Sequence, residues 1–346
     1  MAVDPVPYVV HGAKHSADVF RQGFFDSTGG AEGVSDPKSM GVRATGTPSG
    51  QVRVAPGGVL IPNTYTGGAG QSYTGRNASE TLVDVPASDS TGAKSWYIIF
   101  RVQDPQFGGS APLDPLTGPY SFLECVSTSA TVPDPHYRLA KVVVPKSTAA
   151  IQGSMITDLR SLAQPHRQQL MFGRPRINED AVPAYSANLK QQVSTGGEYF
   201  PGGNGSPNTF QVYVPTWATR ILVDASWMSV RYAGSSNPYG QYWIEYGDEY
   251  KDRTWPGNRQ WEFATQSFAF NAPGSSNNVM RMDWRLMSSQ HMPAKLRGKT
   301  ITMAFKAGRQ DAGPSADVSM DSLSGLGMQL AFVQTTLDPV TNESPQ

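Results

Sequence analysis

The chain has 346 residues, in which 28 Lys and Arg balance 28 Asp and Glu, and only 16% of the residues are charged. A neutral chain without basic runs offers no electrostatic surface for nucleic acid or an anionic membrane, and no apolar run approaches the ~18 residues that span a bilayer. The 35 Gly and 27 Pro suit short strands joined by turns, while 14 Phe, 14 Tyr and 7 Trp are too many for an unstructured chain. We therefore expect a mainly β protein that neither binds nucleic acid nor inserts into a membrane.

The first element expected along the chain is a helix near residues 12–25. Ala13, Ala17, Phe20 and Phe24 fall at helical spacing, and the pair of glycines at 29 and 30 provides a stop.

Two histidines, His11 and His15, lie four residues apart on this expected helix, a spacing that can hold a metal ion. No acidic or cysteine partner accompanies them in the sequence. We therefore expect a solvated or interface face of the helix and no metal site.

Cys125 is the only cysteine, so the chain forms no internal disulfide.

Short strands follow in the first half of the chain. Residues 51–54 alternate apolar and polar side chains, Pro-Gly-Gly interrupts, and a second apolar run ends at Ile61, which predicts a hairpin. Further strands are expected at residues 81–85, 96–102, 120–126 and 137–144. The segment 154–170 carries Met155, Ile156, Leu159 and Leu162 in a helical arrangement that Pro165 closes, so we expect a second short helix there.

The second half has a different composition. Residues 167–208 are rich in Pro, Gly, Asn, Ser and Gln, which is typical of a connector. From residue 209 to about 340, seven or eight strand-like segments alternate with turns, which predicts a β-sandwich or jelly roll, and residues 341–346 form a tail. In "VMRMDWRL" the apolar residues Met282 and Trp284 alternate with Arg281 and Asp283, so one face is expected to be buried.

The segment 237–263 has the densest group of acidic and aromatic residues in the chain. Four of its acids, Glu245, Asp248, Glu249 and Asp252, suggest glycoside hydrolysis, which needs two carboxyl groups held roughly 5–10 Å apart across a cleft. A single hairpin of acids does not provide such a cleft, and no nucleophile, zinc or nucleotide motif occurs elsewhere. We therefore expect no catalytic, cofactor-binding or metal-binding residue and no enzymatic activity.

The same segment is also rich in aromatic residues, which suit recognition of a sugar or a protein. Alternate aromatics on a strand indicate one core face, so either Tyr242, Ile244 and Tyr246 or Trp243 and Glu245 are expected to face the interior. A recognition surface is then expected from the residues nearest the turns, Trp255 and Trp261 above all. Its members are Tyr239, Tyr250, Trp255, Asn258 and Trp261.

Four blocks in the first half resemble, in the same order, the N-terminal region of minor tail proteins of tailed bacteriophages that infect actinobacteria. The resemblance covers about residues 8–166. The blocks are "HSADVFRQGFFDSTGGAEGV", "QVRVAPGGVLIPNTYTGGAGQSYTGRN", "WYIIFRVQDPQF" and "YRLAKVVVPKSTAAIQGSMITDLRSLAQP". The resemblance implies that residues 1–166 form a small β-domain, with flanking short helices, that attaches the chain to the distal tail or baseplate of a virion.

This resemblance also sets the expected partners and the alternatives. We expect a homotrimer, because association would hide the strand edges of small β-domains, in contact with other tail proteins and with a host cell-surface glycan. The C-terminal sandwich would take part in host attachment. Two alternatives stay open: an enzyme of the tail that degrades cell-envelope glycan, and a decoration or fibre protein of the capsid.

Overall fold

The computed structural model describes residues 10–108, 118–175, 177, 188–202, 208–246, 264–271, 278–310 and 316–335. The chain divides into two compact units, one formed mainly by the residues up to Pro165 and the other mainly by His166–Gln334. Each unit has a hydrophobic core of its own. No helix in the described ranges is long and apolar enough to cross a membrane.

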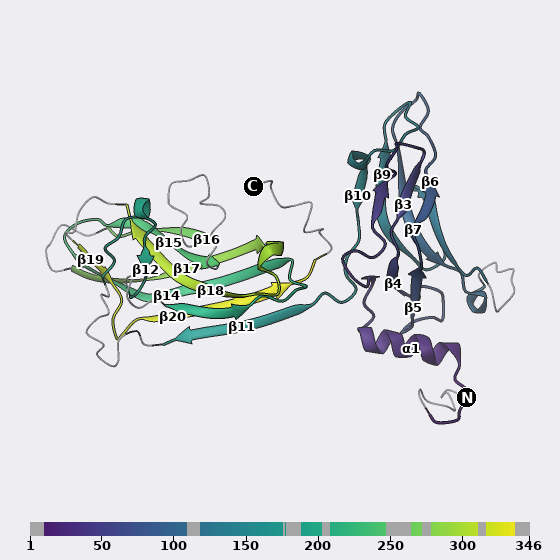
Figure 1. Cartoon of the computed structure of the whole chain (residues 1–346). Helices are drawn as coiled ribbons and strands as arrows, with labels where there is room; N and C mark the ends of the chain where they lie inside the picture. Colours follow the sequence, from purple (N-terminus) through teal and green to yellow (C-terminus); the bar gives the residue numbers. More distant parts are fainter. Residues whose placement is uncertain are drawn as a thin grey trace. The chain divides into compact units, whose positions relative to one another are not determined.

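The first unit packs three antiparallel sheets around one core (Figure 1). The sheet orders are β1-β4-β5, β2-β3-β6 and β10-β9-β7-β8. The elements are α1 (Ala17–Thr28), β1 (Gly33–Val34), β2 (Val42–Ala44), β3 (Gln51–Val54), β4 (Gly57–Pro62), β5 (Ser72–Asn77), β6 (Thr81–Asp84), β7 (Lys94–Val102), β8 (Ser121–Ser127), β9 (His136–Val144) and β10 (Ile156–Asp158), with 3₁₀ turns η1 (Pro105–Phe107) and η2 (Gly153–Met155).

The alternation seen in the sequence places side chains in this core. Val52 and Val54 of β3 are fully buried, and the side chains between them face outward. On the central strand β7, Ile98 and Phe100 point into the same core. The period of two in the sequence therefore accounts for the inner layer of the unit.

The predicted hairpin at residues 51–61 is wrong in its pairing, although both strands exist. β3 pairs with β2 and β6, whereas β4 pairs with β1 and β5, so the chain passes from one sheet to another between them. Gly57 makes this crossing with a φ of 153° and lies so close to Ser39 that a Cβ atom would fall 2.5 Å from it. Both strands then deliver valines to one core from different sheets.

The two predicted helices have different outcomes. The helix expected near residues 12–25 does form, but it begins at Ala17. The Ser16 hydroxyl caps it there by accepting a hydrogen bond from the Val19 N–H. It ends at the predicted glycines, with Gly29 in the left-handed region. The helix predicted at 154–170 is wrong: residues 156–158 pair with β9, and the tertiary pairing outweighs the helical spacing.

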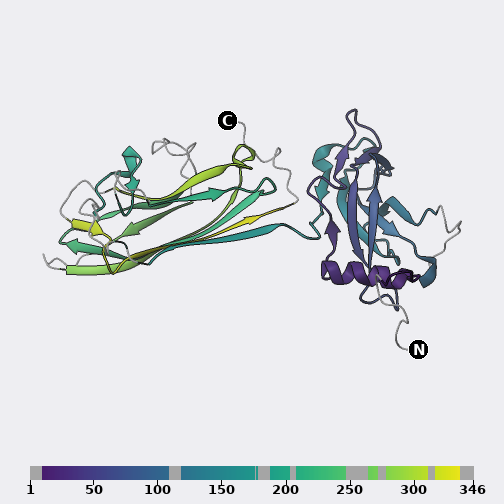
Figure 2. The ribbon, with the colours of Figure 1, turned by 60° about the horizontal axis from the view of Figure 1, so that its bottom comes forward.

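The second unit is a β-sandwich of two antiparallel sheets, which confirms the predicted fold class (Figures 1 and 2). One sheet has the order β11-β20-β14-β17, with β19 also on β14; the other has the order β12-β18-β15-β16, with β13 also on β18. The elements are β11 (Arg167–Arg174), η3 (Val193–Thr195), β12 (Glu198–Tyr199), β13 (Thr209–Tyr213), β14 (Arg220–Gly234), β15 (Tyr239–Tyr246), β16 (Ala264–Ala269), β17 (Asn278–His291), η6 (Ala294–Leu296), β18 (Thr300–Arg309), β19 (Ala316–Ser319) and β20 (Gly325–Val333).

Aromatic side chains from both sheets meet in the core of the sandwich. Trp284 of β17 stacks on Tyr242 and Phe268 of the opposite sheet, with ring centroids 5.0 and 4.4 Å apart. Trp227 of β14 meets the Phe305 ring edge-on at 4.7 Å. The prediction that Trp227 and Trp284 are core residues is confirmed, since both are at most 1% exposed.

The connector predicted at 167–208 is wrong both for its first eight residues and for residues 188–202, where β12 pairs with β18 and Leu189 and Phe200 lie in the core of the sandwich. Residues 167–174 form β11, which pairs along its whole length with β20. Leu170 and Phe172 pack against the core from this edge position. The polar residues that surround them in the sequence are exposed, because an edge strand buries few side chains.

We predict that the two units unfold independently, because each has a separate core. Differential scanning calorimetry of the full chain should show two unfolding transitions. Trp96 is the only tryptophan before residue 200, so tryptophan fluorescence should report mainly the transition of the second unit. One cooperative transition by both probes would contradict the division into two units.

Candidate functional site

The predicted recognition surface is only partly within the described residues. Tyr239 lies at the start of β15 and is 48% exposed. Tyr250, Trp255, Asn258 and Trp261 lie outside the described residues, so their recognition role stays a prediction. The expectation that one face of this strand is buried and the other is not is wrong, because both faces of β15 are buried: Tyr242 and Tyr246 on one, Trp243 and Glu245 on the other.

Glu245, the one acid of that segment within the described ranges, does not face an open cleft. It is 3% exposed, and its carboxylate forms an ion pair with the Lys306 ammonium group, with Oε1 2.8 Å from Nζ. The ammonium group also lies 5.4 Å from the centroid of the Tyr199 ring. Asp248, Glu249 and Asp252 lie outside the described residues. Within the described ranges there is no group of three or more His, Cys, Asp and Glu residues that could hold a metal ion.

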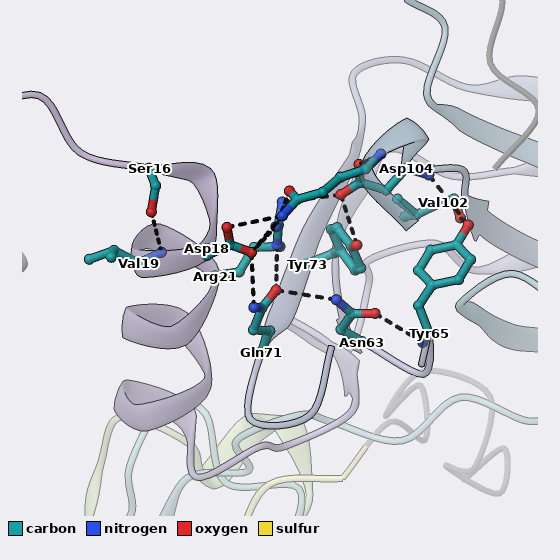
Figure 3. Close-up of polar contacts among 11 residues, drawn as sticks. Ser16, Asp18, Val19, Arg21, Asn63, Tyr65, Gln71, Tyr73, Val102 and Asp104 are labelled. Atoms are coloured by element: carbon teal, nitrogen blue, oxygen red, sulfur yellow. Dashed lines mark hydrogen bonds and ion pairs between the residues drawn. The ribbon is translucent and has the colours of Figure 1, made fainter. Parts of the chain in front are cut away.

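A polar network in the first unit was not predicted from the sequence, and it is the most elaborate arrangement of charged groups in the described residues. Its centre is Arg21, on α1 and 8% exposed. The guanidinium group donates to Gln71 Oε1 at 2.6 Å, to Asp104 Oδ2 at 3.1 Å, to Asp18 Oδ1 at 2.7 Å and to Gln106 Oε1 at 2.6 Å. Figure 3 shows Asp18, Gln71, Tyr73 and Asp104 gathered around it.

Two aromatic rings complete the surroundings of Arg21. The guanidinium carbon lies 5.5 Å from the centroid of the Tyr73 ring and 5.3 Å from that of the Phe107 ring. The Tyr73 hydroxyl donates to the same Asp104 oxygen that receives Arg21. Hydrogen bonds from one guanidinium group therefore tie α1 to the loops before β5 and after β7.

The network continues from Asp104 to a second ion-pair cluster. The Asp104 N–H donates to the Tyr65 hydroxyl, which in turn donates to Asp134 Oδ1 at 2.6 Å (Figure 3 shows the first of these bonds). Arg101 then bridges Asp134, at 2.7 Å, and Glu124, to which it donates two hydrogen bonds. The donors and acceptors satisfy one another, which makes this part of the unit rigid.

The surroundings shift the pKa values of these groups in consistent directions. Burial, together with the carboxylate of Asp134, raises the pKa of Tyr65 to about 12. Burial alone would raise the pKa of Asp134, but hydrogen bonds from Tyr65, Arg101 and Gln103 outweigh it and lower that pKa below 3.8. The hydrogen bond from Gln106 is the main cause of a lowered pKa at Asp18. At neutral pH the carboxylates of Asp18 and Asp134 are therefore charged and Tyr65 is neutral.

We predict that the first unit loses stability in acid. A carboxylate whose pKa is lower in the folded state stabilises the fold above its unfolded pKa, near 3.8, and this stabilisation is lost as the pH falls from there toward the folded pKa. Each unit of pKa difference is worth about 1.4 kcal/mol. Calorimetry from pH 7 to pH 2 should show the transition of the first unit falling steeply below about pH 4. In Asp134→Asn this fall should be shallower; an unchanged slope would contradict the assignment.

The two histidines considered for metal binding precede the helix. The helix begins at Ala17, so the spacing of His11 and His15 does not place them on one helical face. His15 meets the edge of the Phe20 ring at 5.9 Å. His11 is exposed, and His15 is half-buried.

Comparisons with known proteins provide no family assignment. No protein-family model matches the chain, and no curated protein matches it. Among solved structures, the chain is similar to that of infectious bursal disease virus Gx strain, with 10% identity over 88% of this chain and 73% of that chain and a TM-score of 0.22. It is also similar to dimeric latent PorU from Porphyromonas gingivalis, with 10% identity, coverage of 86% and 26%, and a TM-score of 0.24.

A third similarity is to the N-terminal CBM22-1-CBM22-2 tandem domain from Paenibacillus barcinonensis Xyn10C, with 10% identity over 87% of this chain and 96% of that chain and a TM-score of 0.18. TM-scores of this size are too low to support an argument about the function of this chain.

Proposed function

We propose that the chain is a structural protein of a bacteriophage virion, located in the distal tail or baseplate. The first unit attaches the chain to the tail, and the β-sandwich of the second unit takes part in host attachment. Its proposed partners are copies of itself, other tail proteins and a glycan of the host cell surface. We propose no enzymatic activity for it.

The observation that carries the proposal is the agreement of two boundaries. The resemblance to minor tail proteins covers about residues 8–166, and the first compact unit ends at Pro165. A resemblance that ends where a folded unit ends is what a shared attachment domain would produce, since domains are the units that combine with different partners.

Two features of the fold support this division of roles. The Arg21 network fixes the only helix of the described residues against the first unit, which suits a domain that must hold its position under load. The second unit has a core of its own and shares none of its buried residues with the first. The sandwich can therefore present a surface without disturbing the attachment domain.

Labelling of intact particles tests the location. Gold-labelled antibodies against the purified chain, applied to particles of the virus that encodes it, should bind at the tip of the tail in electron micrographs. Preimmune serum is the control. Label on the head would contradict the tail location and support a capsid protein, and no label on intact or gently disrupted particles would contradict a virion protein.

A further inference from the structure

Strand β11 is an unprotected edge of the β-sandwich. It pairs with β20 along its whole length, and among the described residues no strand pairs with its other side (Figure 1). Natural edge strands are usually short, charged or bulged, because their free backbone groups would otherwise pair with other chains. The opposite edge strand, β17, carries Arg281, Asp283 and Arg285 and an irregular register. Residues 168–173 of β11 have no charge, and its register is unbroken.

The direction of the free backbone groups of β11 follows from the register. The Gln334 N–H donates to the His166 carbonyl at 2.9 Å, so these two residues are a hydrogen-bonded pair of the ladder. Such pairs alternate with non-hydrogen-bonded pairs in antiparallel strands, so the even-numbered residues of β11 bond to β20. The N–H and C=O groups of the odd-numbered residues therefore point away from β20, to the open edge. These residues are Arg167, Gln169, Met171 and Gly173.

Apolar side chains at this edge are only half covered. Leu170 and Phe172 pack against the core of the sandwich but stay partly exposed. The Phe172 ring lies 4.8 Å from the ring of Phe210 on β13, which is an edge strand of the facing sheet. A strand added beside β11 would continue the sheet and cover these side chains.

A second copy of β11 can pair with every one of the free backbone groups. An antiparallel pair of two copies can be centred on Leu170. Arg167 of each copy then lies opposite Gly173 of the other, and Gln169 likewise lies opposite Met171. These are the residues whose backbone groups point outward, so all of these groups form hydrogen bonds across the pair. Gly173 also leaves space for the long side chain of Arg167.

Two prolines select this register. Pro165 and Pro175 lie five residues to either side of Leu170. The smallest shift that keeps the outward groups facing each other is two residues, and it sets a proline opposite Gly173 or Arg167. Proline has no N–H, so either shift leaves a carbonyl of the partner strand without its donor. The centred register has no such loss.

Charge favours the antiparallel direction over the parallel one. The charged residues of β11 are at its two ends, Arg167 and Arg174. A parallel pair would bring each arginine near its own counterpart, and like charges on adjacent strands destabilise a sheet. In the antiparallel pair Arg167 lies opposite Gly173 and Arg174 lies opposite His166. The two arginines also point to opposite faces of the sheet, because one is odd-numbered and the other even-numbered.

We propose that the open edge of β11 pairs antiparallel with β11 of a second copy of this chain, centred on Leu170, so that two sandwiches share one continuous sheet. Two eight-residue strands bury less than the roughly 1,200 Å² of a standard interface, so the dimer is weak and forms readily only at high local concentration. The pairing does not depend on the location of the chain in a virion. The homotrimer expected from the sequence would need a different surface.

Sedimentation velocity of the full chain, from micromolar to sub-millimolar concentration, tests the pairing. The chain should pass from monomer toward dimer. Gln169→Pro should lower the association constant by about tenfold or more, because it removes an N–H that points to the open edge and spares the bonds to β20. Gln211→Pro is the matched control: it changes an exposed glutamine of β13 whose N–H points away from β18, and it should leave association unchanged.

Thermal melts of both proline variants should show a folded second unit. A chain that stays monomeric at every concentration would overturn the proposal and leave the edge to a strand of another protein. Association that Gln211→Pro weakens as much as Gln169→Pro would also overturn it, because β11 would not be the pairing strand.

Charged variants test the register without changing the backbone. Gln169 and Met171 are both exposed, and they lie opposite each other in the proposed pair. Gln169→Glu/Met171→Lys should raise the association constant by a few-fold at low salt, whereas Gln169→Lys/Met171→Lys should lower it by a similar factor. In either shifted register one of the two positions would face itself, so the Glu/Lys variant would not gain affinity. Equal association of the two variants would overturn the register centred on Leu170.

Discussion

Replacing Trp284 by alanine should lower the free energy of unfolding of the second unit by about 3–5 kcal/mol, the usual cost of removing a large buried ring. The ring is 1% exposed and lies between Tyr242 and Phe268 of the facing sheet. Its loss leaves a cavity where the two sheets meet. Urea denaturation followed by far-UV circular dichroism measures the change.

Two further variants sharpen this test. Met287→Ala changes a side chain of the same strand that is 71% exposed, and it should shift stability by no more than about 0.5 kcal/mol. Trp284→Phe should cost less than Trp227→Phe, because the Trp227 indole N–H donates to the Phe200 carbonyl at 3.0 Å, whereas the Trp284 indole N–H has no partner among the described residues. If Trp284→Ala and Met287→Ala lower the free energy of unfolding equally, Trp284 does not lie in the core of the sandwich.

Replacing Arg21 by methionine should destabilise the first unit by about 3–5 kcal/mol, the cost of removing one partner from a buried charged pair. The substitution keeps most of the apolar bulk but leaves the carboxylates of Asp18 and Asp104 without their shared cation. Hydrogen exchange should accelerate most in Ala17–Thr28, the helix that the guanidinium group holds.

An exposed ion pair of the same unit provides the control. Lys94 and Asp89 are 2.8 Å apart, and both side chains are about half exposed. Lys94→Met should therefore cost less than about 1 kcal/mol. If Arg21→Met changes stability no more than Lys94→Met, the network does not hold the helix.

The fold class could be predicted because its signal is local. Alternation in β3 and β17 depends only on neighbouring residues, and buried side chains such as Val52 and Trp284 follow it. The prediction that Met282 lies on the same buried face as Trp284 is wrong: Met282 is 38% exposed, beside the irregularity in the pairing of β14 with β17. Pairing is not local. The turn after Val54 has the residues of a hairpin, but the partner of each strand depends on β2, β5 and β6 elsewhere in the chain.

The candidate site could not be predicted for the same reason. The acceptors of Arg21 lie up to 85 residues away in the sequence, and no pattern around Arg21 indicates them. The exposed phenylalanines of α1 were recognised as a helical face, but their spacing does not say which way that face points. The orientation of the helix follows only from the contacts that Arg21 makes with Gln71 and Asp104.

The location of the first unit within the virion tests the central claim most directly. A cryo-electron microscopy reconstruction of the tail of the virus that encodes the chain would resolve each unit by its shape: a three-sheet domain with one helix, and a two-sheet sandwich. We predict that the first unit contacts the distal tail or baseplate and that the sandwich projects from it toward the host. Density for the first unit on the capsid, or a sandwich buried in the tail with the first unit projecting outward, would contradict the proposed function.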